Sequence, residues 1–476
     1  MKYILIMSVL LFAACTPDNQ LENLNPNKPT PEKDTYNPKE SIPQKPLKNQ
    51  NAFILQSGGL VVPNAEVYIN NNLVGSTDLN GAIQINSQWP LPATISFKKT
   101  GYITTSFHQV SSQAQLFTID PVEGSGRIEV RGETTGYGRL KKDDILDFSI
   151  LVPTLTTNSL IHFDMSYFIS SETDKIDLRF GKSMTVPSNV VFPDQTEKYL
   201  FFNIRINKPL YRMYFRKPGT YNLVALHGQA RFSELVDKGT GTPIFDLLNS
   251  FHFKQAGIES FNLTGNTEKN ISIQSMQFDR NVKVTAPGLI SNHTLLAATL
   301  KPFEGQLIPT DIKRLYSNQS TLLNTSSLGD TYTLSVLKRE PTTALDNTLT
   351  QLSLSLEKIK TYDHVPTLLP LVSAPQILDG VLLSKAPNFS DGIQEVGTWY
   401  VLSEVEQFYI ENELIEKKTR LWSHWNQNGW VEQLRIPQLE WNKDPSKIYR
   451  WEVIYLGKHN GSELEVSHIS KNATDF

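Results

Sequence analysis

The sequence predicts an all-β protein in which tandem β-sandwich domains follow a disordered stalk rich in proline and asparagine. Three observations predict this class. From about residue 52 onward, apolar and polar residues often alternate with the period of two that half-buried strands require. Short apolar runs are separated by glycine, proline and asparagine, as is typical of sandwich folds. Residues 16–50, by contrast, hold seven prolines and almost no large apolar side chains.

The composition fits a protein of several folded domains. The chain has 476 residues, of which 39% are hydrophobic and 20% are charged, so it is long enough to bury a sizeable core. Its 45 basic and 48 acidic residues give a net charge of −3, and neither sign dominates. We therefore expect no nucleic-acid partner. A single cysteine excludes internal disulfides and thiolate metal sites, and the sequence indicates no cofactor.

Residues 1–14 have the pattern of a bacterial signal peptide. Lys2 precedes an apolar stretch at residues 4–12, and two small residues, Ala13 and Ala14, come before Cys15. The apolar stretch is about half the roughly 20 residues that a membrane-spanning helix needs. The pattern therefore indicates a leader that is cleaved, and the cleavage site lies next to the only cysteine.

This pattern resembles the bacterial lipobox, in which a diacylglyceryl group is attached to the cysteine and the chain is cleaved just before it. The resemblance implies lipidation of Cys15 and a lipid anchor in a membrane of the cell envelope. Phe12 departs from the pattern, because leucine is typical three places before the cysteine. Thr16, where aspartate would favour the inner membrane, points to the outer membrane. The alternative is an ordinary secreted protein whose leader contains a cysteine by chance.

The segment 15–51 is predicted to be a lipidated cysteine followed by a disordered linker. Its prolines exclude a helix, and it has too few apolar residues to offset the entropy of ordering. Such a segment would hold the folded part away from the membrane.

Residues 52–120 are predicted to form the first β-sandwich. Alternation around Val67 and Ile69 is followed by the turn sequence 75–81, in which Asp78 and Gly81 supply a side-chain acceptor and a positive φ. The stretches 63–67, 75–81 and 101–102 resemble the carboxypeptidase regulatory-like domain, a small prealbumin-like sandwich. The resemblance implies this fold and a non-catalytic accessory role. A calcium loop at Asp78 is the alternative, but further carboxylates are missing.

The middle of the chain is predicted to contain two further β-rich domains, at 121–270 and 271–365. His162 and Asp164 lie two apart on an expected strand and would share one face. They could begin a metal site, but the sequence offers no third ligand, so we predict no metal centre. Nucleophile-elbow and phosphate-loop motifs are also absent from the sequence.

The C-terminal segment 366–476 contains six of the seven tryptophans. Residues 420–425 and 430–434 flank an Asn/Gly-rich turn and are predicted to form a hairpin. Together with the alternating run 449–455, this segment resembles a fibronectin type III-like sandwich. The tryptophans have two interpretations. They form the core, with Trp422 and Trp430 the best candidates, or some of them form an exposed binding platform. Trp425 and Trp441, which lie near turns, are the candidate ligand-binding residues.

The sequence thus predicts a membrane-anchored extracytoplasmic lipoprotein that displays non-catalytic domains for binding or for envelope structure. Expected partners are the membrane, through the lipid, and a polysaccharide or an envelope protein. The alternative functions are polysaccharide binding through exposed tryptophans and hydrolysis. A hydrolase would need either a Ser/His pair or two carboxylates facing each other across a cleft, and the candidate carboxylates are Glu404, Glu406 and Glu432. No catalytic residue is assigned, because acids scattered on strands are typical of a solvated surface.

Overall fold

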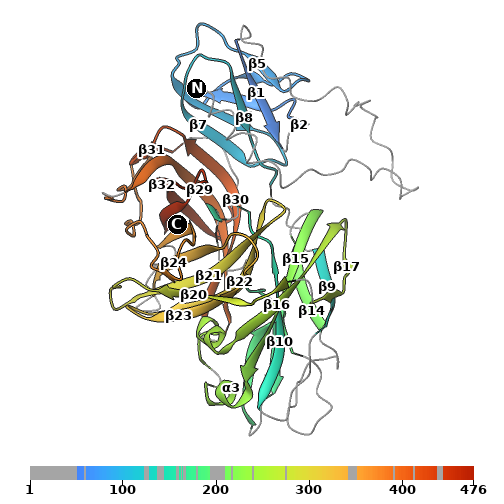
Figure 1. The fold of residues 1–476 in the computed structure, drawn as a ribbon. Helices are drawn as coiled ribbons and strands as arrows, with labels where there is room; N and C mark the ends of the chain where they lie inside the picture. Colours follow the sequence, from blue (N-terminus) through green and yellow to red (C-terminus); the bar gives the residue numbers. More distant parts are fainter. Residues whose placement is uncertain are drawn as a thin grey trace, which may run out of the picture. The chain divides into compact units, whose positions relative to one another are not determined.

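The structure is a computed structural model, and the chain is predominantly β, with several sheets, as the sequence predicts (Figure 1). It describes residues 51–57, 60–122, 128–136, 144–156, 160–161, 163, 168–177, 181–192, 210–215, 218–238, 241–273, 276–340, 351–389, 392–410, 413–436 and 443–476. The leader, Cys15 and the proposed stalk up to residue 50 lie outside the described residues. So do His162, Asp164 and Trp441.

The chain divides into two compact units. Of the described residues, those within 51–122 and 420–427, together with 436 and 443, belong to unit 1, and those within 128–419, 428–435 and 444–476 belong to unit 2. The sequence predicts four folded domains, at 52–120, 121–270, 271–365 and 366–476. Within the described residues, no helix has both the length and the apolar composition to cross a membrane.

Unit 1 is built from two sheets that face each other. The first has the order β2-β1-β5, with β8 pairing in parallel to β1; the bounds are β1 (Ala52–Ser57), β2 (Leu60–Val61), β5 (Ala82–Gln84) and β8 (Gln115–Thr118). The second has the order β7-β6-β3-β4; the bounds are β3 (Glu66–Ile69), β4 (Asn72–Ser76), β6 (Ala93–Lys98) and β7 (Thr104–Val110).

The core of unit 1 lies between these sheets. Phe53 and Leu55 of β1 are fully buried and belong to one apolar cluster with Val67 of β3 and Phe97 of β6. Phe117 of β8 packs edge-on against Phe53, with ring centroids 5.3 Å apart. The alternation seen in the sequence therefore corresponds to residues that point into a sandwich core.

A strand from the distant C-terminal part of the chain extends the second sheet of unit 1. The end of β30 (Glu413–Asn426) runs parallel to β7, with Trp422 opposite Thr104 and Trp425 opposite Phe107. Trp422 is 3% exposed, and its Nε1 donates to Ser106 Oγ at 3.0 Å. Its predicted place in the core is confirmed.

The first part of unit 2 is a second sandwich. One sheet has the order β13-β10-β15-β16-β19; the bounds are β10 (Ile145–Pro153), β13 (Val190–Val191), β15 (Gly219–Arg231), β16 (His252–Leu263) and β19 (Met276–Gln277). In the facing sheet β9 pairs with three strands; the bounds are β9 (Ile128–Thr135), β14 (Leu210–Phe215), β17 (Thr267–Glu268) and β18 (Ile271–Ser272). Val130, Tyr211, Leu223 and Leu263 join the two sheets in one buried cluster.

Short elements lie between the long strands of this sandwich. β11 (Thr173–Asp177) and β12 (Ser183–Pro187) form a separate hairpin. After β15 come α3 (Phe232–Lys238), α4 (Ile244–Leu247) and the 3₁₀ turn η3 (Leu248–Ser250), just before β16. Figure 1 shows α3 near the end of the long strands β10, β15 and β16.

The second part of unit 2 is dominated by one large sheet with the order β22-β21-β24-β25-β33-β32-β29. The bounds are β21 (His293–Phe303), β22 (Gln306–Leu315), β24 (Tyr332–Arg339), β25 (Leu352–Lys358), β29 (Ile393–Ile410), β32 (Ile448–His459) and β33 (His468–Asp475). A small sheet, β23-β20-β26, packs on it through Val282, Val284 and Leu323; the bounds are β20 (Arg280–Thr285), β23 (Ser320–Thr325) and β26 (Asp363–His364).

Direct pairing of β25 with β33 places the stretches 271–365 and 366–476 in one sheet. Leu354 lies opposite Ile469 in this ladder, and both side chains are buried. Residues 366–476 therefore do not form a sandwich of their own. The expected division near residue 365 falls inside unit 2, because the sheet hydrogen bonds cross it.

The predicted hairpin of 420–425 with 430–434 is wrong. The last sheet of unit 2 has the order β27-β28-β31, and its bounds are β27 (Gln376–Leu378), β28 (Val381–Leu383) and β31 (Gln433–Arg435). β31 thus pairs with β28, not with β30. Trp430 explains the difference, because its Nε1 donates to the Leu456 carbonyl at 2.8 Å and holds the chain on β32. Trp430 itself is half-buried.

Candidate functional site

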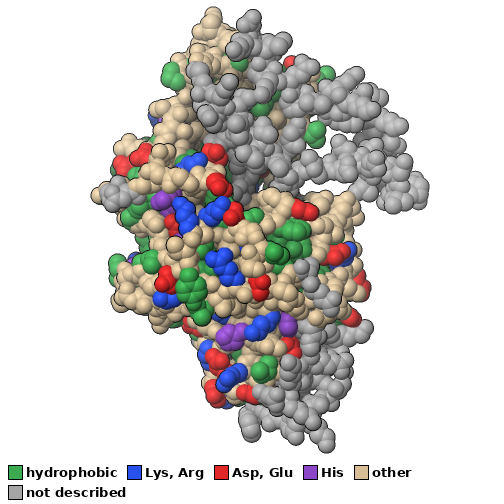
Figure 2. Space-filling view, in the orientation of Figure 1, with side chains coloured by type: hydrophobic (Ala, Val, Ile, Leu, Met, Phe, Trp, Pro, Cys, Tyr) green, Lys and Arg blue, Asp and Glu red, His purple; other side chains and the backbone are tan. Residues whose placement is uncertain are grey.

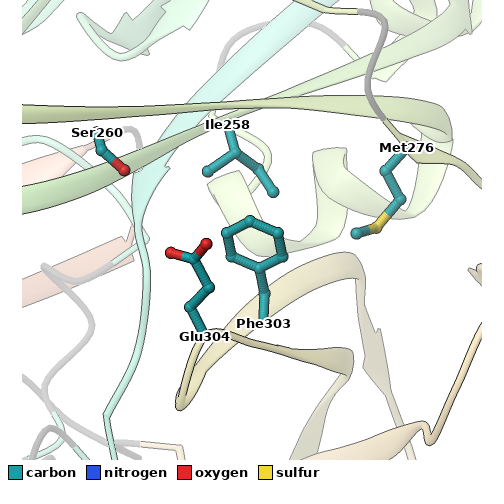
Figure 3. A pocket seen from close by; sticks show the side chains of 5 residues that line it. All are labelled: Ile258, Ser260, Met276, Phe303 and Glu304. Atoms are coloured by element: carbon teal, nitrogen blue, oxygen red, sulfur yellow. The ribbon is translucent and has the colours of Figure 1, made fainter.

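A small hollow lies between β16 and the turn that joins β21 to β22. Its volume is about 200 Å³, and five side chains line it: Ile258, Ser260, Met276, Phe303 and Glu304 (Figure 3). Ile258 and Ser260 come from β16, Met276 begins β19, and Phe303 ends β21. Figure 3 shows Phe303 and Glu304 rising from the turn toward the strand that carries Ile258 and Ser260. The three apolar side chains are half-buried, and the two polar ones are exposed.

A chain of hydrogen bonds beside the hollow joins the turn to the sheet of β15 and β16. Ser260 Oγ donates to Asn222 Oδ1, and Asn222 Nδ2 donates to Gln306 Oε1 at 3.0 Å. Gln306 Oε1 also accepts from Thr154 Oγ1. The neighbouring residues Leu155 and Leu307 exchange two backbone bonds of 2.8 Å. The walls of the hollow are therefore tied to each other on one side.

These bonds also decide what Ser260 can offer to a ligand. Its single hydroxyl proton is committed to Asn222, so only oxygen lone pairs remain. The Glu304 carboxylate is an acceptor as well, and it makes no hydrogen bond or ion pair with the described part of the chain. The polar groups lining the hollow are therefore acceptors.

Glu304 occupies a backbone conformation that glutamate rarely adopts. Phe303 pairs with Gln306, so Glu304 and Gly305 form a two-residue hairpin turn, with φ of 47° and 76°. Asn-Gly and Asp-Gly are the preferred sequences for such a turn. Of the eight non-glycine residues with positive φ in the described ranges, six are asparagine or aspartate, and Glu304 is one of two exceptions. Local stability does not explain a glutamate here, and strained positions of this kind gather at functional sites.

The sequence-predicted ligand residues fall elsewhere. Trp425 lies on β30 in unit 1 and is half-buried, not exposed. Trp441 and Cys15 lie outside the described residues. No tryptophan in the described ranges is classed as exposed, so the exposed aromatic platform given as one alternative is not seen there. On the face drawn in Figure 2, acidic and basic side chains are interspersed among the coloured residues.

The three candidate carboxylates each have a partner. Glu404 Oε1 lies 2.8 Å from Lys447 Nζ, and Glu406 Oε2 lies 3.5 Å from Lys417 Nζ. Glu432 Oε1 accepts the backbone N–H of Ala386 at 2.9 Å. The first two contacts are typical of ion pairs on a solvated surface, and the third is typical of a side chain that anchors a loop.

Another polar cluster contains the residue types of a catalytic triad, but it is closed. Ser467 Oγ lies 2.9 Å from His468 Nδ1, and His468 Nε2 donates to the Thr367 carbonyl at 3.1 Å. Glu357 Oε1 lies 3.6 Å from the same Nε2. Ser467 and His468 are 2% and 0% exposed, so no substrate reaches the hydroxyl. The cluster fastens residues 367–372 to β33, with Ser470 and Asn472 donating to the carbonyls of Pro370 and Val372.

Among the described residues, no three His, Cys, Asp or Glu side chains gather closely enough to hold a metal ion. At the suggested calcium loop, Asp78 Oδ1 accepts the backbone N–H groups of Asn80 at 2.8 Å and Ala82 at 2.9 Å. That carboxylate oxygen stabilises the turn, as the turn interpretation predicts.

Comparison with known proteins adds no family. No family model matches the chain, and no curated protein sequence matches it. Among solved structures, the major pilin protein (T-13) from Streptococcus pyogenes serotype GAS131465 is 11% identical, over 64% of this chain and 96% of that chain. Its TM-score of 0.10 is too low for the likeness to bear on fold or function.

The hollow was not predicted from the sequence. Its lining residues come from positions 258–260, 276 and 303–304, which no motif connects. One local signal exists: Glu304-Gly305 stands between two apolar strands where Asn-Gly or Asp-Gly is usual. That signal locates the turn, but it does not show which strand the turn faces.

Proposed function

We propose that this protein is a lipid-anchored protein of the bacterial cell envelope whose β-rich body is a non-catalytic module for binding or envelope structure. The observation that carries the proposal is the position of Cys15. The only cysteine of 476 residues directly follows an apolar stretch and two alanines. Only a thiol can form the thioether of a lipoprotein, and two or more acyl chains give stable anchoring.

The sheet arrangement of unit 1 supports the proposal that part of the protein is a non-catalytic accessory domain. Two facing sheets, a shared aromatic core and the Asp78 turn are what a carboxypeptidase regulatory-like, prealbumin-like sandwich would contain. We propose that unit 1 is such a domain. Its role would be structural, as the resemblance to these non-catalytic accessory domains implies.

The anchor is tested with the Cys15→Ser variant of the full chain. The wild type should fractionate with membranes and incorporate a radiolabelled or alkyne-labelled fatty acid. Cys15→Ser should lose the label and appear in the soluble fraction, whereas the control Thr16→Ser should behave as the wild type. Membrane association of Cys15→Ser, or a wild type without label, would refute the lipoprotein proposal.

Polysaccharide binding is kept as the second candidate because Trp425 is half-buried and so retains part of its surface. The test is a tryptophan-fluorescence titration with bacterial and algal polysaccharides and peptidoglycan fragments. A saturable change with one glycan that is lost in Trp425→Phe or Trp441→Phe would support it. No change across the panel would favour a structural role or a protein partner.

A further inference from the structure

We propose that the hollow between β16 and the β21–β22 turn binds a lysine side chain of a protein partner. The inference deepens the binding half of the proposed function and does not depend on the lipid anchor. It rests on the chemistry of the five lining residues and on the conformation of Glu304.

The lining selects a hydrogen-bond donor. Ser260 presents lone pairs because its proton is given to Asn222, and Glu304 presents a carboxylate without a described partner. A ligand that also offers only acceptors, such as a phosphate or a carboxylate, would be repelled by Glu304. An ammonium group carries three donors and a positive charge, and it matches both oxygens.

The rest of the lining selects an apolar stem behind the charge. Ile258, Met276 and Phe303 are half-buried, so they keep apolar surface that a hydrocarbon chain can cover. In Figure 3 the Glu304 carboxylate lies beside the Phe303 ring, between that ring and Ser260. A cation held at the carboxylate would therefore lie near an aromatic ring, which favours a positive charge. Lysine has this combination of a flexible methylene stem and a compact cationic head.

The conformation of Glu304 is the independent observation. A left-handed turn position normally carries asparagine, aspartate or glycine, and a glutamate there has a longer side chain at the cost of turn stability. The longer side chain brings the carboxylate up beside Phe303 and toward Ser260 (Figure 3). The hydrogen bonds through Asn222 and Gln306 fix the turn against β16, so the backbone that carries Glu304 is already in place before a ligand arrives.

The experiment follows the Met276 methyl group by NMR in the full chain, labelled at the methyl carbons of its methionines and purified in detergent. The Met276 signal is assigned from Met276→Leu. The probe is a capped lysine, Nα-acetyl-lysine methylamide, and the matched compound is the norleucine analogue, which has the same stem without the charge. The lysine compound should shift the Met276 signal saturably, and norleucine should bind at least tenfold more weakly.

Glu304→Gln keeps the shape of the side chain and removes its charge, and it should weaken lysine binding about 10- to 100-fold, as expected for loss of a charged hydrogen bond. The control Glu259→Gln removes a carboxylate from the adjacent position of β16, where Glu259 pairs with Lys269 at 2.6 Å, and should leave binding unchanged. Unchanged signals of the other methionines would show that both variants fold.

Three results would overturn the proposal. The first is a Met276 signal that the lysine compound does not move, and the second is equal binding by the Glu304→Gln protein. The third is preference for another cation: tighter binding of the arginine analogue, choline or 1,5-diaminopentane would assign the hollow to that class instead of a lysine side chain.

Discussion

Replacing Glu452 by glutamine should destabilise unit 2 more than the removal of any solvent-exposed charge. Glu452 lies on β32 and is 4% exposed, and its Oε1 accepts from Lys418 Nζ at 2.8 Å and from Lys471 Nζ at 3.4 Å. Lys471 also donates to the Phe163 carbonyl at 3.1 Å. The substitution leaves two ammonium groups in a buried site with no carboxylate between them.

The size of the effect follows from burial. At an effective dielectric constant of about 20, a contact at 2.8 Å contributes on the order of 6 kcal/mol of Coulomb energy, most of which offsets the desolvation of the charges. Removing one member of a buried pair typically costs about 3–5 kcal/mol, because the remaining charge is left uncompensated. We expect this range for Glu452→Gln. Lys471 limits the loss, since burial already lowers its pKa and the variant can release its proton.

The free energy of unfolding is measured in two ways, by urea unfolding monitored through tryptophan fluorescence and by calorimetry. Glu404→Gln is the matched control. The Glu404–Lys447 pair has the same 2.8 Å separation, but its side chains are 31% and 44% exposed, so its loss should cost less than about 1 kcal/mol. Adding Lys471→Met to Glu452→Gln should recover part of the stability. Equal losses in the two single variants would refute the argument from burial.

The pH dependence gives a further check on the same variant. In the folded state Lys471 binds its proton less tightly than in the unfolded state, because burial lowers its pKa. The unfolded state therefore holds more protons just below the ordinary lysine pKa of 10.5, and stability rises as the pH increases through that window. Without Glu452 the pKa should fall further, so this rise should begin at lower pH in Glu452→Gln. A pH profile parallel to that of the wild type would contradict this mechanism.

Two further predictions concern single carboxylates. Burial by itself would raise the pKa of Glu357, but the imidazoles of His364 and His468 beside its carboxylate and the backbone N–H of Thr367 lower it to about 2, from 4.5. The ionised Glu357 carboxylate therefore contributes up to about 3 kcal/mol to the free energy of unfolding above about pH 4.5, and this contribution should be lost as the pH falls toward 2. Acid unfolding of Glu357→Gln should lack this pH-dependent loss. Glu304→Asn should raise the stability of unit 2 by about 0.5–1 kcal/mol, measured by thermal unfolding, because asparagine tolerates the left-handed conformation. A lower melting temperature would show that the glutamate is not strained.

The local features of this protein are those that the sequence determined. Alternation at Val67 and Ile69 predicts strand faces, and both side chains are buried. The Asp78 turn follows from a short polar side chain that bonds its own backbone. Each of these features depends on neighbours within a few residues, so periodicity and turn chemistry are enough to find it.

Only the tertiary structure decided which strands meet. β30 ends beside β7, some 300 residues earlier in the chain, while β31 pairs with β28 and β25 pairs with β33. Strands have similar local patterns whatever their partner, so alternation fixes the buried face and leaves the pairing open. The same reason hides the hollow: Ser260 and Glu304 are ordinary polar residues in the sequence, and they become a site because a hairpin turn is fastened against another sheet through Asn222 and Gln306.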